Sequence, residues 1–218
     1  MSKTPSFKKA PSNLTLIKQK PKSVRPKTQR LPREVREAQI CAAALSVFRE
    51  YGYEGGSISR IAKKSELAEG ALYKFFGSKK EILEAVICNW YDSTLADYEV
   101  KLNTISNTEQ KLRYAIRHNV HCRCEDPAIS NLYLELRRDQ CFKSSRLVDY
   151  NKKYIGILRE IIRSIRSKSQ DSDISISAVT RVIFSYAELG TEQYRINQVP
   201  LNQEQLTEEI LKIAKRLI

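Results

Sequence analysis

Residues 57–83 read SISRIAKKSELAEGALYKFFGSKKEIL, and this segment determines how the rest of the chain is interpreted. Its apolar residues occur at helical spacing in two very short runs, 58–64 and 69–75, with a tight connection through Glu66 and Leu67. Two short helices joined this closely are typical of a helix-turn-helix, in which the second helix enters the major groove of DNA. The segment therefore predicts a DNA-binding unit.

The second of these helices is expected to expose a small, polar surface. With Leu72, Phe75 and Phe76 turned inward, the outer residues are Glu69, Gly70, Ala71, Tyr73 and Lys74. The small residues at 70 and 71 let the backbone approach base edges, while Tyr73 and Lys74 can bind phosphate oxygens. The alternative interpretation is a helical corner with solvated charges.

The next helix is predicted to begin with a capping box, Ser78-x-x-Glu81. Free backbone N–H groups and Lys79 would then lie together at the positive end of a helix. Such an end binds phosphate well, so the sequence predicts a phosphate anchor directly after the second short helix.

Residues 35–90 resemble the DNA-binding signature of the TetR family of transcriptional regulators, through Ile61-Ala62, Leu67, Gly70-x-Leu72-Tyr73-x-Phe75-Phe76 and Ser78-Lys79-x-x-Ile82-Leu83. The remaining chain matches the family only in length and helical pattern. Family members are all-helical, two-domain homodimers that usually repress transcription and release DNA when a small molecule binds. The resemblance implies the same organisation here.

By position, the resemblance also assigns DNA contacts. Ser57 matches a hydroxyl at the start of the second of three helices in the DNA-binding domain, and Tyr73 and Lys79 match phosphate contacts. The full predicted set is Ser57, Ser59, Arg60, Glu69, Gly70, Ala71, Tyr73, Lys74 and Lys79. The chain departs from the family pattern at three places: Ala68 replaces a common capping Ser or Thr, Lys64-Ser65-Glu66 replaces Ala-Ala-Gly, and Phe75 replaces Tyr or His. The base sequence that is read stays open.

Most of the formal net charge of +13 lies at the start of the chain of 218 residues. Residues 1–33 hold ten Lys and Arg, five of the seven prolines and no acidic residue. Residues 34–89 are neutral overall, with eight basic and eight acidic side chains. Much of the non-specific attraction to DNA would then come from the first segment.

We expect this first segment to be disordered or extended, because it combines prolines and charges with few large apolar groups. A basic arm that follows the DNA backbone or enters the minor groove is the preferred interpretation. A solubilising extension and an organelle transit peptide are the alternatives, and the prolines oppose the amphipathic helix that transit peptides form.

The five cysteines are odd in number and mostly lie within helical patterns, which predicts reduced thiols in a cytoplasm. The resemblance further implies association with the bacterial nucleoid. The sequence shows no apolar run long enough for a membrane span and no signal-peptide core, so we expect a soluble protein.

Apolar residues recur at helical spacing along the whole remaining chain, without strand-like alternation, so the predicted fold class is all-α. The expected helices are 34–51, ended by Gly52, then 58–64, 69–75, 79–99, 108–123, one beginning at Pro127, 145–167, 174–195 and 203–217. The expected organisation is a basic, Pro-rich arm at 1–33, a three-helix DNA-binding domain at 34–78, and a larger effector-binding and dimerisation domain at 79–218.

The apolar stripes of the larger domain must supply both a pocket and a dimer seam. The predicted pocket walls are Trp90, Ile116, Val120, Leu132, Tyr133, Leu136, Tyr154 and Leu158. The resemblance assigns the final two helices to a homodimer interface, formed by Val182, Ile183, Tyr186, Gly190, Leu206, Ile210, Ile213 and Leu217. For any single residue the alternative is a place in the packed core.

A group of possible metal ligands lies at 118–124. His118, His121, Cys122 and Cys124 offer imidazole and thiol groups that suit zinc or copper. Their spacing matches no zinc framework, so we predict no metal and no cofactor, and polar helix-end residues with half-buried thiols are the preferred interpretation. Metal or redox sensing stays open as the alternative.

Together these features predict a dimeric repressor that leaves a palindromic operator when a small apolar or amphipathic effector tilts the fourth helix. The alternative is an architectural or adaptor protein of the same fold whose second domain binds a protein partner. An enzyme is not expected, because the sequence has no glycine-rich phosphate loop and no nucleophile, base and acid pattern. The operator, the effector and the direction of regulation are not determined.

Overall fold

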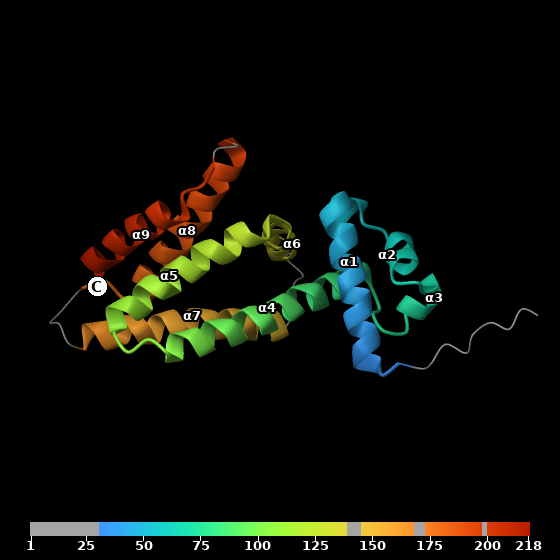
Figure 1. The fold of residues 1–218 in the computed structure, drawn as a ribbon, viewed down its shortest axis with the longest axis horizontal. Helices are drawn as coiled ribbons and strands as arrows, with labels where there is room; N and C mark the ends of the chain where they lie inside the picture. The colour runs from blue at the N-terminus through green and yellow to red at the C-terminus, as the bar shows by residue number, and fades with distance from the viewer. Residues whose placement is uncertain (1–30, 139–144, 168–172, 198–199) are drawn as a thin grey trace, which may run out of the picture. The chain divides into compact units, whose positions relative to one another are not determined.

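The computed structural model describes residues 31–138, 145–167, 173–197 and 200–218 (Figure 1). Within these ranges every element of regular secondary structure is a helix, which confirms the predicted all-α fold class. Of the basic arm predicted at 1–33, residues 1–30 lie outside the described part of the chain, so the arm stays a prediction.

The helices follow the predicted order, with differences mainly at their ends. They are α1 Arg33–Gly55, α2 Ile58–Lys64, α3 Glu69–Leu72, α4 Lys79–Asn103, α5 Thr108–Glu125, α6 Pro127–Arg138, α7 Ser145–Arg166, α8 Ile176–Asn197 and α9 Gln203–Leu217. We refer to α1–α3 as the head and to α4–α9 as the body. Across the described residues, none of these helices has the length and apolar character needed to cross a membrane.

Helix α1 is interrupted at Gly52, where φ is 70° and ψ is 175°. The sequence predicts that the helix stops here, but one further turn follows and the element ends at Gly55. Gly56 is buried against Phe48, and a Cβ on Gly56 would lie 2.6 Å from Cδ1 of that ring. The close approach therefore requires a residue without a side chain at position 56, directly before the Ser57 cap of α2.

Three local features set the geometry of the helix-turn-helix. Ser57 caps α2, because its Oγ accepts a hydrogen bond from the Arg60 N–H at 3.2 Å. In the turn, Glu66 takes a left-handed φ of 57°, a conformation that glycine adopts more easily. Ala68 precedes α3 without any side-chain cap hydrogen bond, so the N–H groups at the start of α3 lack the partner that a Ser or Thr would provide.

The α-helical part of α3 is shorter than predicted, since it ends at Leu72 and not at residue 75. Beyond it the chain continues in tighter turns, in which the N–H groups of Lys74 and Phe75 bond the carbonyls of Ala71 and Leu72 at 3.2 and 2.9 Å. A helix of one turn with an uncapped start has little stability of its own, so its position depends on buried Leu72.

Helix α4 begins with the Ser78 cap that the predicted capping box requires, but the Glu81 carboxylate bonds the N–H of Gly77 and not that of Ser78. Ser78 Oγ accepts from the Glu81 N–H at 3.1 Å, and Glu81 Oε2 accepts from the Gly77 N–H at 2.9 Å. The same helix packs on α1 in the head and on α5, α6 and α7 in the body. It therefore connects the two regions as a continuous element.

Helix α5 is central to the body, because it packs against each of α4, α6, α7, α8 and α9. Leu112, Ile116 and Val120 of α5 are almost completely buried. Aromatic side chains add to this core, and Tyr98 of α4 stacks on His118 of α5 at a centroid distance of 4.3 Å. Burial of these apolar and aromatic surfaces stabilises the arrangement of the six helices.

Candidate nucleic-acid interface and internal pocket

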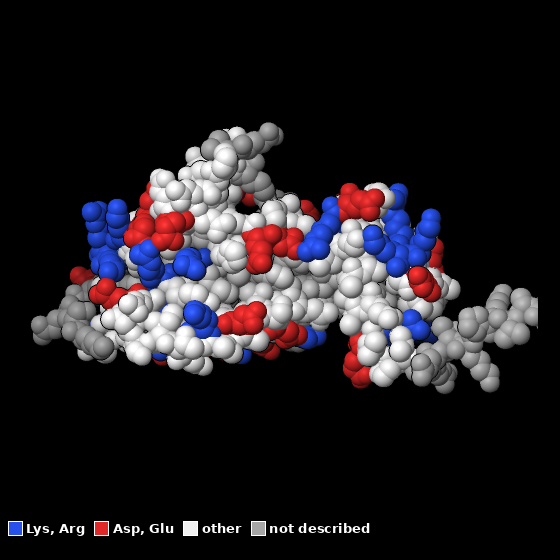
Figure 2. All heavy atoms as spheres, viewed as in Figure 1, with Lys and Arg blue, Asp and Glu red and all other residues white. Residues whose placement is uncertain are grey.

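The exposed surface of the head is polar, and Figure 2 shows lysine and arginine side chains there among acidic ones. On α3 and the turn after it, Glu69, Gly70, Tyr73 and Lys74 are exposed and Ala71 is half-buried, while Leu72 faces the core. A Cβ on Gly70 would meet no atom within 4 Å, so the internal packing does not require glycine at this position. The surface of α3 is thus small and accessible.

Two of the predicted DNA-binding residues at the start of α2, Arg60 and the cap residue Ser57, already have partners inside the head. The Arg60 guanidinium lies over the Tyr51 ring, 3.9 Å from its centroid. Ser57 Oγ accepts the cap hydrogen bond, but its hydroxyl proton remains able to donate to a phosphate oxygen. Ser59 is exposed.

Lys79 holds the start of α4 against the end of α1. Its Nζ donates hydrogen bonds to the carbonyl oxygens of Tyr53 at 2.9 Å and Glu54 at 3.4 Å, and it lies 4.3 Å from the centroid of the Tyr53 ring. An ammonium group has three N–H donors, so one is left for a phosphate. The structure therefore gives Lys79 a role in positioning the head, and its phosphate contact stays a prediction.

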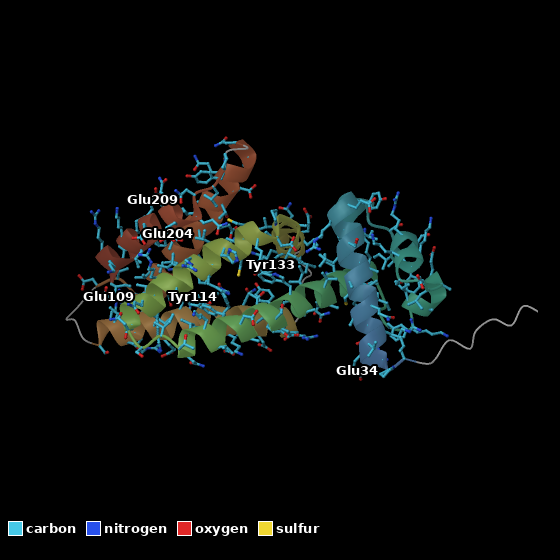
Figure 3. All side chains as sticks on the ribbon, viewed as in Figure 1. Glu34, Glu109, Tyr114, Tyr133, Glu204 and Glu209 are labelled. Carbon is cyan, nitrogen blue, oxygen red and sulfur yellow. The ribbon has the colours of Figure 1, made fainter. Side chains whose placement is uncertain are left out.

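The body contains a pocket of about 580 Å³ that is lined by residues of α4, α5, α6, α7 and α8 and by Leu201. Of the predicted walls, Trp90, Tyr133 and Tyr154 line it, and Figure 3 marks Tyr133 on α6. The other predicted walls are buried in the core and do not border this pocket: Ile116, Val120, Leu132, Leu136 and Leu158.

The pocket is also lined by polar groups, which the helical spacing of apolar residues in the sequence did not predict. The Tyr91 and Tyr133 hydroxyls both donate to Asn151 Oδ1, at 3.2 and 2.9 Å. The Glu188 carboxylate pairs with Arg123 and Arg137, at 3.5 and 3.2 Å. A sequence signal did exist for part of this lining, because polar Asn119 and Thr180 interrupt otherwise apolar helix faces.

The residues at 118–124 form an aromatic and thiol cluster. His118 Nδ1 lies 2.9 Å from the Tyr154 hydroxyl and 3.7 Å from Cys122 Sγ. Burial lowers the pKa of His118 to about 4, so its ring is neutral at neutral pH, and burial raises the pKa of the Cys122 thiol to about 12. A protonated thiol is a weak nucleophile and metal ligand. Within the described ranges no three His, Cys, Asp or Glu side chains are grouped to hold a metal ion.

The residues predicted for a dimer seam divide into an outer and an inner set. Val182 and Tyr186 are exposed on α8, and nearby Leu189, which was not predicted, is 70% exposed. The inner set is packed within or against the core of its own protomer: Ile183, Gly190, Leu206, Ile210 and Leu217. Ile213 is half-buried on α9. At Gly190 a Cβ would lie 2.8 Å from Leu206 Cδ1, so this glycine permits α8 and α9 of one chain to pack closely.

Comparison with known proteins identifies the class. Residues 40–86 match the family described as bacterial regulatory proteins, tetR family. The chain is 33% identical over 87 residues to the HTH-type transcriptional activator FasR of Mycolicibacterium smegmatis, spanning 40% of each protein. It is 23% identical over 177 residues to the fatty acid metabolism regulator protein of Bacillus subtilis, covering 80% of this chain and 91% of that protein.

The fold extends this similarity beyond the head. The structure of the transcriptional regulator FadR from Bacillus subtilis in complex with stearoyl-CoA superposes with a TM-score of 0.71 at 22% identity, covering 83% of this chain and 98% of FadR. The arrangement of α1–α9 therefore defines an all-helical protein with an N-terminal helix-turn-helix DNA-binding domain. Residues 40–86 therefore carry a DNA-binding domain of the type found in the TetR family of bacterial regulatory proteins.

Proposed function

We propose that this protein is a homodimeric, effector-responsive transcriptional regulator that represses from a palindromic operator in the bacterial cytoplasm, associated with the nucleoid. The observation that carries the proposal is the surface of α3, where Gly70, Tyr73 and Lys74 are exposed over buried Leu72 in the segment that matches the family. Small and polar residues on such a helix allow close approach to base edges and contacts to phosphates.

The phosphate contacts fit the ends of the neighbouring helices. Ser57 lies at the N-terminus of α2, and Ser78 and Lys79 lie at the N-terminus of α4. Helix N-termini carry partial positive charge and free N–H groups that bind phosphate. These contacts would fix the orientation of α3, while the residues of α3 itself read the bases.

The outer face of α8 supports the proposal of a homodimer. Val182, Tyr186, Leu189 and Ile196 are exposed and are spaced at intervals of three, four and seven residues, so they form an apolar stripe. An exposed apolar stripe on a long helix is typical of an interface. We propose that it packs on the same stripe of a second copy, which would set the two α3 helices about 34–36 Å apart, or a multiple of that distance, for the two half-sites.

The effector site is the pocket of the body. Its volume of about 580 Å³ is within the usual range for small-molecule sites, about 300–1,000 Å³. Trp90, Tyr133 and Phe184 supply aromatic walls. An apolar or amphipathic effector suits this lining, and the likeness to FadR in complex with stearoyl-CoA supports a long-chain acyl compound as one candidate.

Helices α4 and α6 connect the pocket with the head. Tyr133 of α6 lines the pocket, and the same helix packs on α1. Arg49 of α1 pairs with Asp126, the residue directly before α6, and a smaller cavity of about 370 Å³ separates parts of α1 and α6. An effector that displaces α6 and tilts α4 would therefore change the position of the head. It can do so only through a difference in its affinity for the two positions.

Selection of bound sequences from random DNA with the full chain tests this function. We expect a palindromic consensus, and we expect Lys74→Ala to weaken binding without changing the consensus. Tyr73→Phe removes a single hydroxyl and should cause a smaller loss. A consensus without symmetry, or no enrichment at all, would contradict the proposal.

A further inference from the structure

The pocket carries more positive than negative side chains. Its lining includes four guanidinium groups and two carboxylates. Two of the arginines, Arg123 and Arg137, are both paired with the Glu188 carboxylate. The other two are Arg159 of α7 and Arg181 of α8, and neither forms an ion pair or hydrogen bond with any residue that the structure describes.

These two arginines lie at the same end of the pocket. Helices α7 and α8 are consecutive, pack on each other and run in opposite directions (Figure 1). The rings of Tyr154 and Phe184 meet across them at 5.8 Å. Arg159 lies five residues after Tyr154 and Arg181 lies three residues before Phe184, so both are on the same side of this contact, about 7 Å and about 5 Å along their helices.

Both side chains are also exposed, so they lie at the rim and not in the interior. The walls next to them are apolar, since Ile155 and Phe184 lie one helical turn away on the same helices. Aromatic and aliphatic walls with two guanidinium groups at the rim match a molecule with an apolar body and a charged end.

We infer that the pocket binds amphipathic anions, with Arg159 and Arg181 holding a carboxylate or phosphate group and the aromatic walls holding the apolar body. This inference rests on the proposed function, because it specifies the effector of that site. Guanidinium groups present paired N–H donors that match both oxyanions, and two neighbouring guanidinium groups gain from a shared counter-charge.

An organic cation is the main competing ligand, because aromatic walls can bind cations and the lining has two carboxylates. Glu188 is already neutralised by two arginines, however, and Arg159 and Arg181 add two further positive charges to the rim. The field at the rim therefore favours an anion.

The test uses the fluorescence of Trp90, which is the single tryptophan of the sequence and lines the pocket. The probes share a dodecyl chain and differ in their end group: dodecyl phosphate, dodecanoate, dodecanol and dodecyltrimethylammonium, each below its micelle concentration. We expect at least one of the two anions to bind about tenfold or more tightly than dodecanol, and the cation to bind more weakly than dodecanol. The ratio between the anions shows whether the site prefers phosphate or carboxylate.

Two variants and a matched control test whether Arg159 and Arg181 cause the preference for anions. Arg159→Gln and Arg181→Gln should each lower the affinity for the preferred anion about tenfold and leave that for dodecanol unchanged. Lys152→Gln removes the same charge from an exposed position on α7 that does not line the pocket, and should change neither affinity. Circular dichroism of each variant checks that the helices are retained.

The inference is overturned if dodecanol binds as tightly as both anions, if none of the probes changes the Trp90 emission, or if both glutamine variants keep the preference for the anion. Operator binding is measured separately. A palindromic operator without any anion preference would remove this inference and leave the proposed regulator intact. If anion binding depends on Arg159 and Arg181 but no operator is found, the preference for anions stands and the proposed regulator is contradicted.

Discussion

The outer faces of α3 and α8 are both exposed, but their chemistry is opposite. The residues exposed on α3 and in the turn that follows it are small, polar or charged, such as Gly70 and Lys74. Those exposed on α8 include Val182, Leu189 and Ile196, which are large and apolar. A polyanion with a hydrated backbone suits the first surface, whereas only another apolar surface suits the second. This difference in chemistry is the reason why we propose DNA as the partner of the α3 surface and a second copy of the chain as the partner of the α8 face.

The largest effect is expected when a charge is placed on the α8 face. Leu189→Glu would bury a carboxylate against its own copy in the dimer, so we expect monomers and a loss of operator affinity of about a hundredfold or more, because two linked heads bind far better than one. Sedimentation velocity and DNA titration measure both effects. Val100→Glu introduces the same charge at an exposed position on α4, where Val100 is 68% exposed, and should leave the dimer intact. Equal behaviour of the two variants would count against the α8 face.

Mild acid should destabilise the body through a buried histidine, since both histidines of the chain, His118 and His121, lie in the body. Burial lowers the pKa of His118 from 6.5 to about 4. Between pH 4 and pH 6.5, His118 is therefore protonated in the unfolded chain and neutral in the folded chain. The stability from burying the neutral ring is present above pH 6.5 and is lost as the pH falls towards 4, by at most about 3 kcal/mol.

Denaturant titrations across this pH range measure the effect. In His118→Gln the loss of stability between pH 6.5 and pH 4 should be smaller than in the unchanged protein. In His121→Gln it should persist, because that side chain is exposed. A pH dependence that is identical in both variants would show that the ring of His118 is not responsible.

On the α3 surface, Gly70→Ala separates DNA contact from folding. A Cβ at Gly70 meets no protein atom within 4 Å, and the same holds for Gly156 on α7. Both alanine variants should fold with equal or slightly higher stability, since alanine favours helix by about 1 kcal/mol over glycine. Only Gly70→Ala should weaken operator binding, by about tenfold, if the backbone of α3 approaches bases closely. Equal operator affinity in the two variants would mean that residue 70 is not at the interface.

Lys74→Ala tests the same α3 surface through the salt dependence of DNA affinity. A phosphate contact releases about one counterion, so the slope of log affinity against log salt should fall by about one, with similar losses on specific and unrelated DNA. Lys152→Ala, on α7, is the control with the same loss of charge. An unchanged slope in the Lys74 variant would remove this residue from the set of phosphate contacts.

The smallest expected effect is at the start of α3. Ala68 has extended backbone angles, φ −74° and ψ 147°, and makes no side-chain cap hydrogen bond. Ala68→Ser should raise the free energy of unfolding by about 1 kcal/mol, because a serine hydroxyl can accept from an N–H of the first turn of α3. Thermal denaturation measures it. A decrease in stability would show that the turn before α3 has no room for the hydroxyl.

The head was predictable from the sequence because its determinants are local. Ser57, Gly70 and Lys79 lie within a short segment, and helix geometry alone separates inward Leu72 from its exposed neighbours. The length of α3 was predicted less well, since an uncapped helix of one turn passes into tighter turns that apolar spacing does not reveal. Which contacts α3 makes with DNA stays a prediction.

The pocket was predicted only in part, because its walls come from residues as far apart as Trp90 and Leu201. Apolar spacing identifies residues that face the interior, but it does not tell which of them border a cavity. Ile116 and Val120 therefore look the same as Tyr154 in sequence, yet they pack in the core. Arg159 and Arg181 carry no local signal, because charged residues on a helix are usually solvated.

The most direct test of the account is hydroxyl-radical footprinting of the full chain on its selected DNA. We predict two symmetric protected segments whose centres are about 34–36 Å apart, or a multiple of that distance, both weakened together in Leu189→Glu and in Lys74→Ala. A single protected segment, or protection that Lys74→Ala leaves unchanged, would contradict the claim that a symmetric pair of α3 helices reads the duplex.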